Sequence, residues 1–68
     1  MTVTITKDDQ GNLLKHVETV DIDESQITQL NFIEDDVTEV TWEEAYMLDD
    51  GRWIGNDDTD GWVMIGIV

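Results

Sequence analysis

The chain has 68 residues, with 17 Asp and Glu against three Lys and Arg, so its formal net charge at pH 7 is −14. A chain of this length supports one small core, and we expect residues 1–68 to form a single small acidic domain. Because the cations Lys7, Lys15 and Arg52 are scattered along the chain, its composition excludes direct binding to nucleic acid or to an anionic membrane surface.

The composition indicates a folded protein. Hydrophobic residues make up 40% of the chain and three residues are Trp, each of which buries a large area. The chain has no Cys, which excludes disulfides and thiol chemistry. The first residues lack the features of a signal peptide and no apolar run is long enough to span a membrane, so we expect a cytoplasmic protein.

Alternation of apolar and polar side chains predicts two strands near the N-terminus, over residues 2–6 and 13–22. The turn residues 8–12 between them predict a hairpin. The phase of the alternation changes close to Glu18, where we expect a β-bulge. The first strand contains no Pro, so its edge is free to pair with a second copy, and we expect a monomer or a homodimer.

Residues 24–33 are compatible with two structures. Asp23 or Ser25 would cap a short helix, or an irregular turn, that places Ile27 and Leu30 inward, and we favour this structure. The alternative is a strand with one face formed by Ile27, Gln29, Asn31 and Ile33.

Residues 37–48 form the clearest strand of the sequence. Alternation places Trp42, Glu44 and Tyr46 on a mostly apolar face, whereas Glu39, Glu43 and Ala45 share a mostly acidic face exposed to water. The next turn, Asp49-Asp50-Gly51-Arg52, contains the Asp-Gly pair that is typical of hairpins.

The C-terminal part contains a strand that begins at Trp53, an acidic loop over residues 56–60 and a last strand from Trp62 to Val68. Because the last strand is apolar on both faces, we expect it to be central in the sheet. The predicted fold is mainly β, or small α+β, as an antiparallel meander of about five strands with one short helix around 24–33.

Groups able to carry out catalysis are scarce. His16 is the only histidine and Ser25 the only serine, and neither lies in a catalytic motif. Paired carboxylates act as acid and base only where a cleft raises the pKa of one of them. A domain of this size has little room for such a cleft, so we expect a protein that is not an enzyme and needs no cofactor.

One segment resembles the start of a calcium-binding loop. Asn56, Asp58 and Asp60 stand at the first, third and fifth positions, and Gly61 follows at the sixth. The twelfth position, where such loops place a bidentate Glu, is Ile67. We therefore expect an ordinary Asp-rich turn without metal and keep calcium as the alternative.

The uncompensated charge is the strongest functional feature of the sequence. A small soluble domain needs a net charge of only about 2 to 8 for solubility, and a larger excess destabilises the fold through self-repulsion. Carboxylates two residues apart on a strand are about 6.6 Å apart, which is roughly two phosphate steps along a DNA strand. We expect the partner-binding residues among the acidic clusters, which are Glu34, Asp35, Asp36, Glu39, Glu43, Asp49, Asp50, Asp57, Asp58 and Asp60.

In size, charge and lack of catalytic groups the chain resembles the small acidic DNA-mimic inhibitors that phages direct against host enzymes, including anti-CRISPR and anti-restriction proteins. Residues 24–40 also resemble phage uracil-DNA glycosylase inhibitors, in which Glu-Ser-Ile precedes an acidic stretch punctuated by valines. Here Gln26 separates Glu24-Ser25 from Ile27, and Glu34-Asp35-Asp36-Val37 and Glu39-Val40 follow. The second resemblance implies that Glu24 and Ser25 face the DNA-binding groove of the glycosylase and that Ile27 lies near an apolar anchor.

These features predict a phage-encoded inhibitor in the host cytosol, with a basic nucleic-acid-binding host protein as its partner. The three Trp and Tyr46 would add apolar anchors where they are exposed. Two alternatives remain open: a small phage virion or tail-associated module, and an antitoxin or immunity protein against a basic toxin. In each case we expect the stability of the fold to rise with added salt and with mild acidification.

Overall fold

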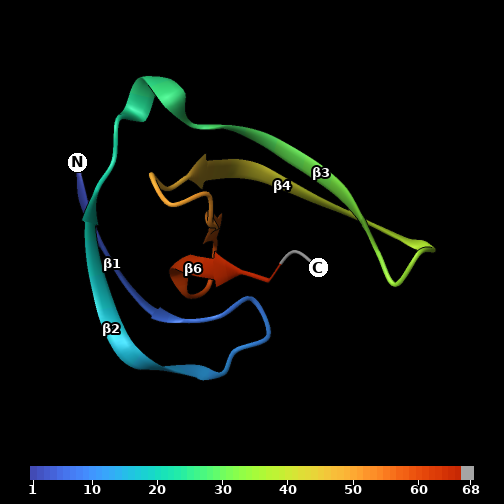
Figure 1. The fold of residues 1–68 in the computed structure, drawn as a ribbon, viewed down its shortest axis with the longest axis horizontal. Coiled ribbons are helices and arrows are strands. Elements are labelled where there is room, and N and C mark those ends of the chain that lie inside the picture. The colour runs from blue at the N-terminus through green and yellow to red at the C-terminus, as the bar shows by residue number, and fades with distance from the viewer. Residues whose placement is uncertain (67–68) are drawn as a thin grey trace.

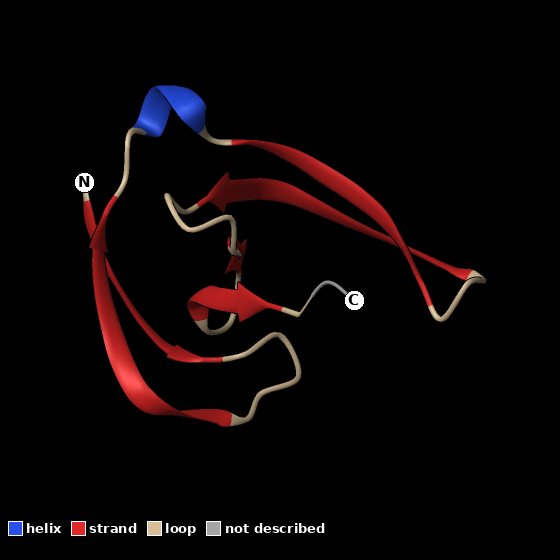
Figure 2. Cartoon of the chain, viewed as in Figure 1, coloured by secondary structure: helices blue, strands red, loops and turns tan. Residues whose placement is uncertain are grey.

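The computed structural model describes residues 1–66, which form two antiparallel sheets of two and four strands. The elements are β1 (Thr2–Lys7), β2 (Leu13–Asp21), the 3-10 turn η1 (Glu24–Gln26), β3 (Thr28–Glu34), β4 (Thr38–Met47), β5 (Trp53–Asp57) and β6 (Gly61–Ile65). β1 pairs with β2, and β3 to β6 form a meander in chain order (Figures 1 and 2). The expected mainly β antiparallel fold is confirmed, with six strands in these residues.

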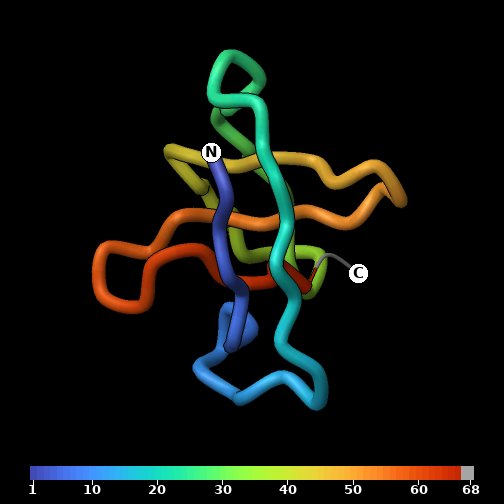
Figure 3. Tube along the Cα trace, turned by 90° about the vertical axis from the view of Figure 1, so that its left-hand side faces the viewer, coloured from blue at the N-terminus to red at the C-terminus, as the bar shows by residue number. Residues whose placement is uncertain are grey.

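The β1–β2 hairpin packs across one face of the four-stranded sheet. Figure 3 shows its two strands running steeply across β4, β5 and β6. Val3 and Ile5 of β1 are buried there in one cluster with Ile22, Leu48 and Ile54. The turn that follows β1 is joined to β6 by a backbone hydrogen bond, in which the N–H of Asp9 donates to the carbonyl of Met64 at 2.8 Å.

The other face of β5 and β6 is covered by the bend of β4. Gly55 has no side chain, and the ring of Trp42 occupies that space: a Cβ at residue 55 would lie 2.4 Å from Trp42 Cε3. The Cδ1 of Ile65 would be 2.8 Å from the same Cβ. Ala45 and Val63, the register partners of Gly55, are buried on this face.

This two-sided packing corrects the prediction for the last strand. β6 is one of the two edge strands of the four-stranded sheet and not a central strand. Its apolar residues on both faces are explained by the two layers that enclose it, since Met64 packs towards β1 and Ile65 lies beside Trp42. The predicted continuation through Ile67 and Val68 lies outside the described residues.

The helix predicted for residues 24–33 is limited to η1. Asp23 caps it as expected, since its Oδ1 accepts from the N–H of Ser25 at 3.0 Å and from the hydroxyl at 2.7 Å. From Thr28 onward the chain is β3, because β-branched and aromatic residues favour a strand and β4 supplies backbone partners. Ile27 packs against the core and is not an exposed anchor.

Two bulges adjust the long strands. The β1–β2 register shifts between Leu13 and Glu18, next to the position where the bulge was predicted. A second shift, which alternation alone did not predict, places Glu43 and Glu44 opposite Gln29. The extra residue reverses the phase of β4, so Ala45 is fully buried and Glu44 is exposed, contrary to the faces predicted for them.

Candidate functional site: the acidic arm

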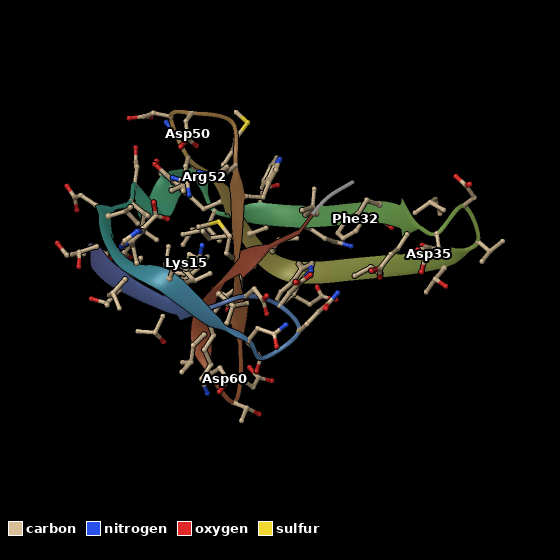
Figure 4. All side chains as sticks on the ribbon, turned by 60° about the horizontal axis from the view of Figure 1, so that its bottom comes forward. Lys15, Phe32, Asp35, Asp50, Arg52 and Asp60 are labelled. Atoms are coloured by element: carbon tan, nitrogen blue, oxygen red, sulfur yellow. The ribbon has the colours of Figure 1, made fainter. Side chains whose placement is uncertain are left out.

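The hairpin of β3 and β4, residues 28–47, is named the acidic arm here because it contains carboxylates and no Lys, Arg or His. It extends from the body of the molecule, and Asp35 lies at its far tip, well away from Lys15 and Arg52 (Figure 4). Its carboxylates are Glu34, Asp35, Asp36, Glu39, Glu43 and Glu44.

The tip of the acidic arm is a tight turn with an unusual sequence. The N–H of Val37 donates to the carbonyl of Glu34 at 3.1 Å, and the two residues between them have positive φ, 54° at Asp35 and 63° at Asp36. Turns of this kind match the twist of a hairpin but favour Asn and Gly. Asp adopts this conformation more readily than most other residues. The turn therefore presents two adjacent exposed carboxylates on a defined backbone.

The strands of the acidic arm continue this acidic surface. Glu39 lies opposite Ile33, and its Oε1 accepts from Asn31 Nδ2 at 2.9 Å, which orients the carboxylate along the strand. At the bulge, Glu43 and Glu44 are both exposed. They line one side of an open hollow of about 430 Å³ whose other side includes Asp57 and Asp58.

Lys7, Arg52 and the N-terminal amine form ion pairs on other parts of the molecule. Within residues 1–66 every ion pair lies outside the acidic arm: Lys7–Asp60 at 3.1 Å, Arg52–Glu18 at 2.9 Å, Arg52–Asp50 at 2.7 Å and the N-terminal amine–Asp21 at 3.4 Å. Arg52 binds both oxygens of Glu18 with its two terminal nitrogens. The Arg52–Glu18 pair connects β2 to the β4–β5 turn, and the Lys7–Asp60 pair connects β1 to the β5–β6 turn.

Three carboxylates outside the acidic arm have lowered pKa values because they accept hydrogen bonds within turns. The N–H of Asn12 lowers the pKa of Asp8, and the Ser25 hydroxyl lowers that of Asp23. The N–H of Arg52, followed by its side chain, lowers the pKa of Asp50. A general acid at neutral pH needs the opposite shift, so these groups serve the turns.

The structure separates the predicted partner-binding residues into distinct groups. Five of them lie on the acidic arm, and Asp57 and Asp58 face its base across the open hollow. Asp49 and Asp50 line a different hollow, of about 420 Å³, together with Asp21 and Arg52. Asp60 is paired with Lys7. Glu44 was missed by sequence reasoning, because only the bulge brings it to the surface.

The aromatic residues are not exposed anchors. Trp42, Trp53, Trp62 and Tyr46 are all half-buried. The Tyr46 hydroxyl accepts from the N–H of Asp23 at 3.3 Å, and Trp42 fills the space above Gly55. The exposed apolar side chains near the tip of the acidic arm are instead Ile33 and Val37.

In the loop that resembles a calcium site, the turn is held by the carboxylate of Asp57, which is not one of the three candidate ligands. Asp57 Oδ1 accepts from the N–H of Thr59 at 2.7 Å and from the N–H of Asp60 at 3.3 Å. Among residues 1–66, no three His, Cys, Asp or Glu side chains are grouped to hold a metal ion. Of the candidate ligands, Asp60 accepts from Lys7 Nζ at 3.1 Å, and Asn56 Nδ2 donates to Glu44 Oε1 at 3.4 Å.

Comparisons of the chain with models of known protein families, with curated proteins and with solved structures give no match. In the part of the chain that the structure describes, no helix has the length and apolar character needed to cross a membrane. The charge and geometry of the acidic arm are therefore the features that point to a function.

Proposed function

We propose that the protein is a non-enzymatic inhibitor, encoded by a phage, that binds the nucleic-acid groove of a basic host protein. The acidic arm takes the place of nucleic-acid phosphates in that groove. The observation that carries the proposal is the segregation of charge: six carboxylates lie on one hairpin without a cation, while the ion pairs of residues 1–66 lie on the rest of the molecule.

The physical basis is complementarity with a site built for phosphate. A nucleic-acid groove holds Lys and Arg side chains already positioned for a row of negative charges. The acidic arm offers such charges on a hydrogen-bonded hairpin, so little backbone entropy is lost on binding. Long-range attraction between the two surfaces speeds association, and salt screens it.

Suitable targets by this chemistry are a CRISPR effector, a restriction enzyme or a DNA-repair enzyme. The test measures the Kd of the immobilised protein for a purified member of each class, with uracil-DNA glycosylase as the repair enzyme, over a series of salt concentrations. We expect one of them to bind at low salt, to be released as salt rises, and to be displaced by double-stranded DNA.

Charge-neutral variants connect that binding to the acidic arm. We expect the double variant Glu39→Gln/Glu43→Gln to weaken binding about tenfold, mainly through slower association. The matched control, Asp21→Asn/Asp49→Asn, removes the same charge from exposed residues at the other hollow and should bind almost as the unmodified protein does. Absence of binding by all three enzymes at low salt, or equal weakening by both double variants, would contradict the proposal.

A further inference from the structure

Two apolar side chains stand exposed among the carboxylates at the tip of the acidic arm. The side chain of Ile33 is 59% exposed and that of Val37 is 82% exposed. Ile33 lies directly opposite Glu39 in the β3–β4 register, and Val37 precedes Glu39 by two residues. Cross-strand partners share one face, so the Ile33 side chain lies beside the Glu39 carboxylate. Val37 lies in the tip turn, directly before β4 and beside the exposed carboxylates of Asp35 and Asp36.

Packing within the molecule does not account for these two residues. The inner face of the acidic arm is formed by Leu30, Phe32 and Val40, which are half-buried, and Ile33 points to the opposite side. Thr would serve β3 equally well at position 33, because it is also β-branched, and the tip turn has no need of an apolar side chain at Val37. Exposed apolar groups with a polar rim are typical of interaction sites.

The surrounding charge selects the kind of partner. We propose that Ile33 and Val37 enter an apolar hollow in the floor of a protein groove whose rim carries Lys and Arg. Nucleic acid and anionic lipid have the same sign of charge as the acidic arm and are repelled by it. A second copy of the chain, at −14, is repelled as well. This inference rests on the proposed function and adds the apolar contact to it.

The two kinds of contact have separable kinetic roles. The carboxylates steer the encounter and raise the association rate, an effect that salt removes. The apolar side chains act after docking, because their burial slows dissociation and depends little on salt. Removing the apolar contact should therefore change the dissociation rate and leave the salt dependence of Kd unaltered.

The test compares two double variants. Ile33→Thr/Val37→Thr removes the proposed contact and keeps the β-branched shape. Leu13→Thr/Val17→Thr is the matched control, because Leu13 and Val17 are also highly exposed but lie on β2 beside Lys15. The probe is whichever of the three purified enzymes binds the unmodified protein. Thermal unfolding of each variant checks that the fold is retained.

We expect Ile33→Thr/Val37→Thr to raise Kd about tenfold or more through faster dissociation, with an unchanged slope of log Kd against log salt. The control variant should bind as the unmodified protein does. An unchanged Kd for the arm variant overturns the inference and leaves the proposed function intact, whereas failure of the unmodified protein to bind any enzyme overturns both. Equal weakening by the control variant, or concentration-dependent dimerisation that Ile33→Thr/Val37→Thr abolishes, also overturns it.

Discussion

The β1–β2 hairpin and the acidic arm are both long antiparallel hairpins, but they carry charge in opposite ways. In the first, Lys7 and the N-terminal amine pair with carboxylates, Glu18 is held by Arg52, and Lys15 is exposed. The acidic arm has no cation at all. The net charge of −14 is therefore unevenly distributed, because the ion pairs that neutralise carboxylates lie outside the acidic arm.

The difference extends to how each hairpin is attached to the rest of the molecule. β1 contributes Val3 and Ile5 to the core cluster. The Lys7–Asp60 pair connects the hairpin to the β5–β6 turn, and the Glu18–Arg52 pair connects it to the β4–β5 turn. The acidic arm is anchored near its base, where Trp42 lies over Gly55, and its tip reaches into solvent. One hairpin thus stabilises the fold, while the other presents charge.

The largest expected effect on stability comes from closing the space that anchors the acidic arm. In Gly55→Ala the new Cβ would overlap the ring of Trp42 and approach Ile65, so the ring must move out of a packed interface. We expect a loss of about 2–3 kcal/mol in the free energy of unfolding, measured by urea denaturation. Gly66→Ala is the control, because its Cβ meets only Asp9 at an ordinary 3.7 Å. Equal stability of the two variants would show that Trp42 does not need this space.

A smaller effect on Tm should appear when the salt concentration is varied. Salt relieves repulsion among the carboxylates of the acidic arm, but it weakens the ion pairs that Arg52 makes with Glu18 and Asp50. Raising NaCl from about 0.01 M to about 0.2 M screens repulsion on the acidic arm, so we expect the Tm of the unmodified protein to rise. Glu39→Gln/Glu43→Gln should flatten this rise, since less repulsion remains to be screened. Arg52→Gln should lower Tm most at low salt, where its pairs with Glu18 and Asp50 are strongest. A Tm that is independent of salt would contradict the account of repulsion.

The smallest effect concerns the turn carboxylates. The pKa of Asp23 is lowered in the folded state by its hydrogen bonds from Ser25. A lowered pKa contributes stability above the unfolded value, near 3.8, and that contribution is lost as pH falls through the folded value. We expect Asp23→Asn to reduce the fall in Tm between about pH 4 and pH 2. Identical pH profiles for the variant and the unmodified protein would refute this role.

Much of the fold follows from local pattern, and the exceptions have identifiable causes. Alternation and turn residues predicted the β1–β2 hairpin and the β4–β5 hairpin, because these signals act over a few residues. The β3–β4 hairpin was missed, since a short helix was favoured where β3 (Thr28–Glu34) lies. The bulge at Glu43–Glu44 was not predicted, since it is defined by the register of β4 against β3 and not by the alternation within β4. The edge position of β6 was missed because layers that cover both faces of a strand leave the same apolar pattern as a central position.

For the candidate site, sequence alone identified the acidic residues but not their grouping. The carboxylates of the acidic arm and those of the paired turns have the same composition and similar spacing. Only the folded structure shows that Arg52 reaches Glu18 and that Lys7 reaches Asp60, which leaves the acidic arm without compensation. Ile33 and Val37 became noticeable only through their exposure.

The surface that contacts the enzyme can be located directly on the protein. Backbone amide signals of the isotope-labelled protein would be recorded with and without a basic enzyme that binds it, and again after double-stranded DNA is added. If the acidic arm is the binding surface, the changes will be concentrated at residues 33–44 and will be reversed by DNA. Changes confined to residues 13–21 and 49–52, with the acidic arm unaffected, would contradict it.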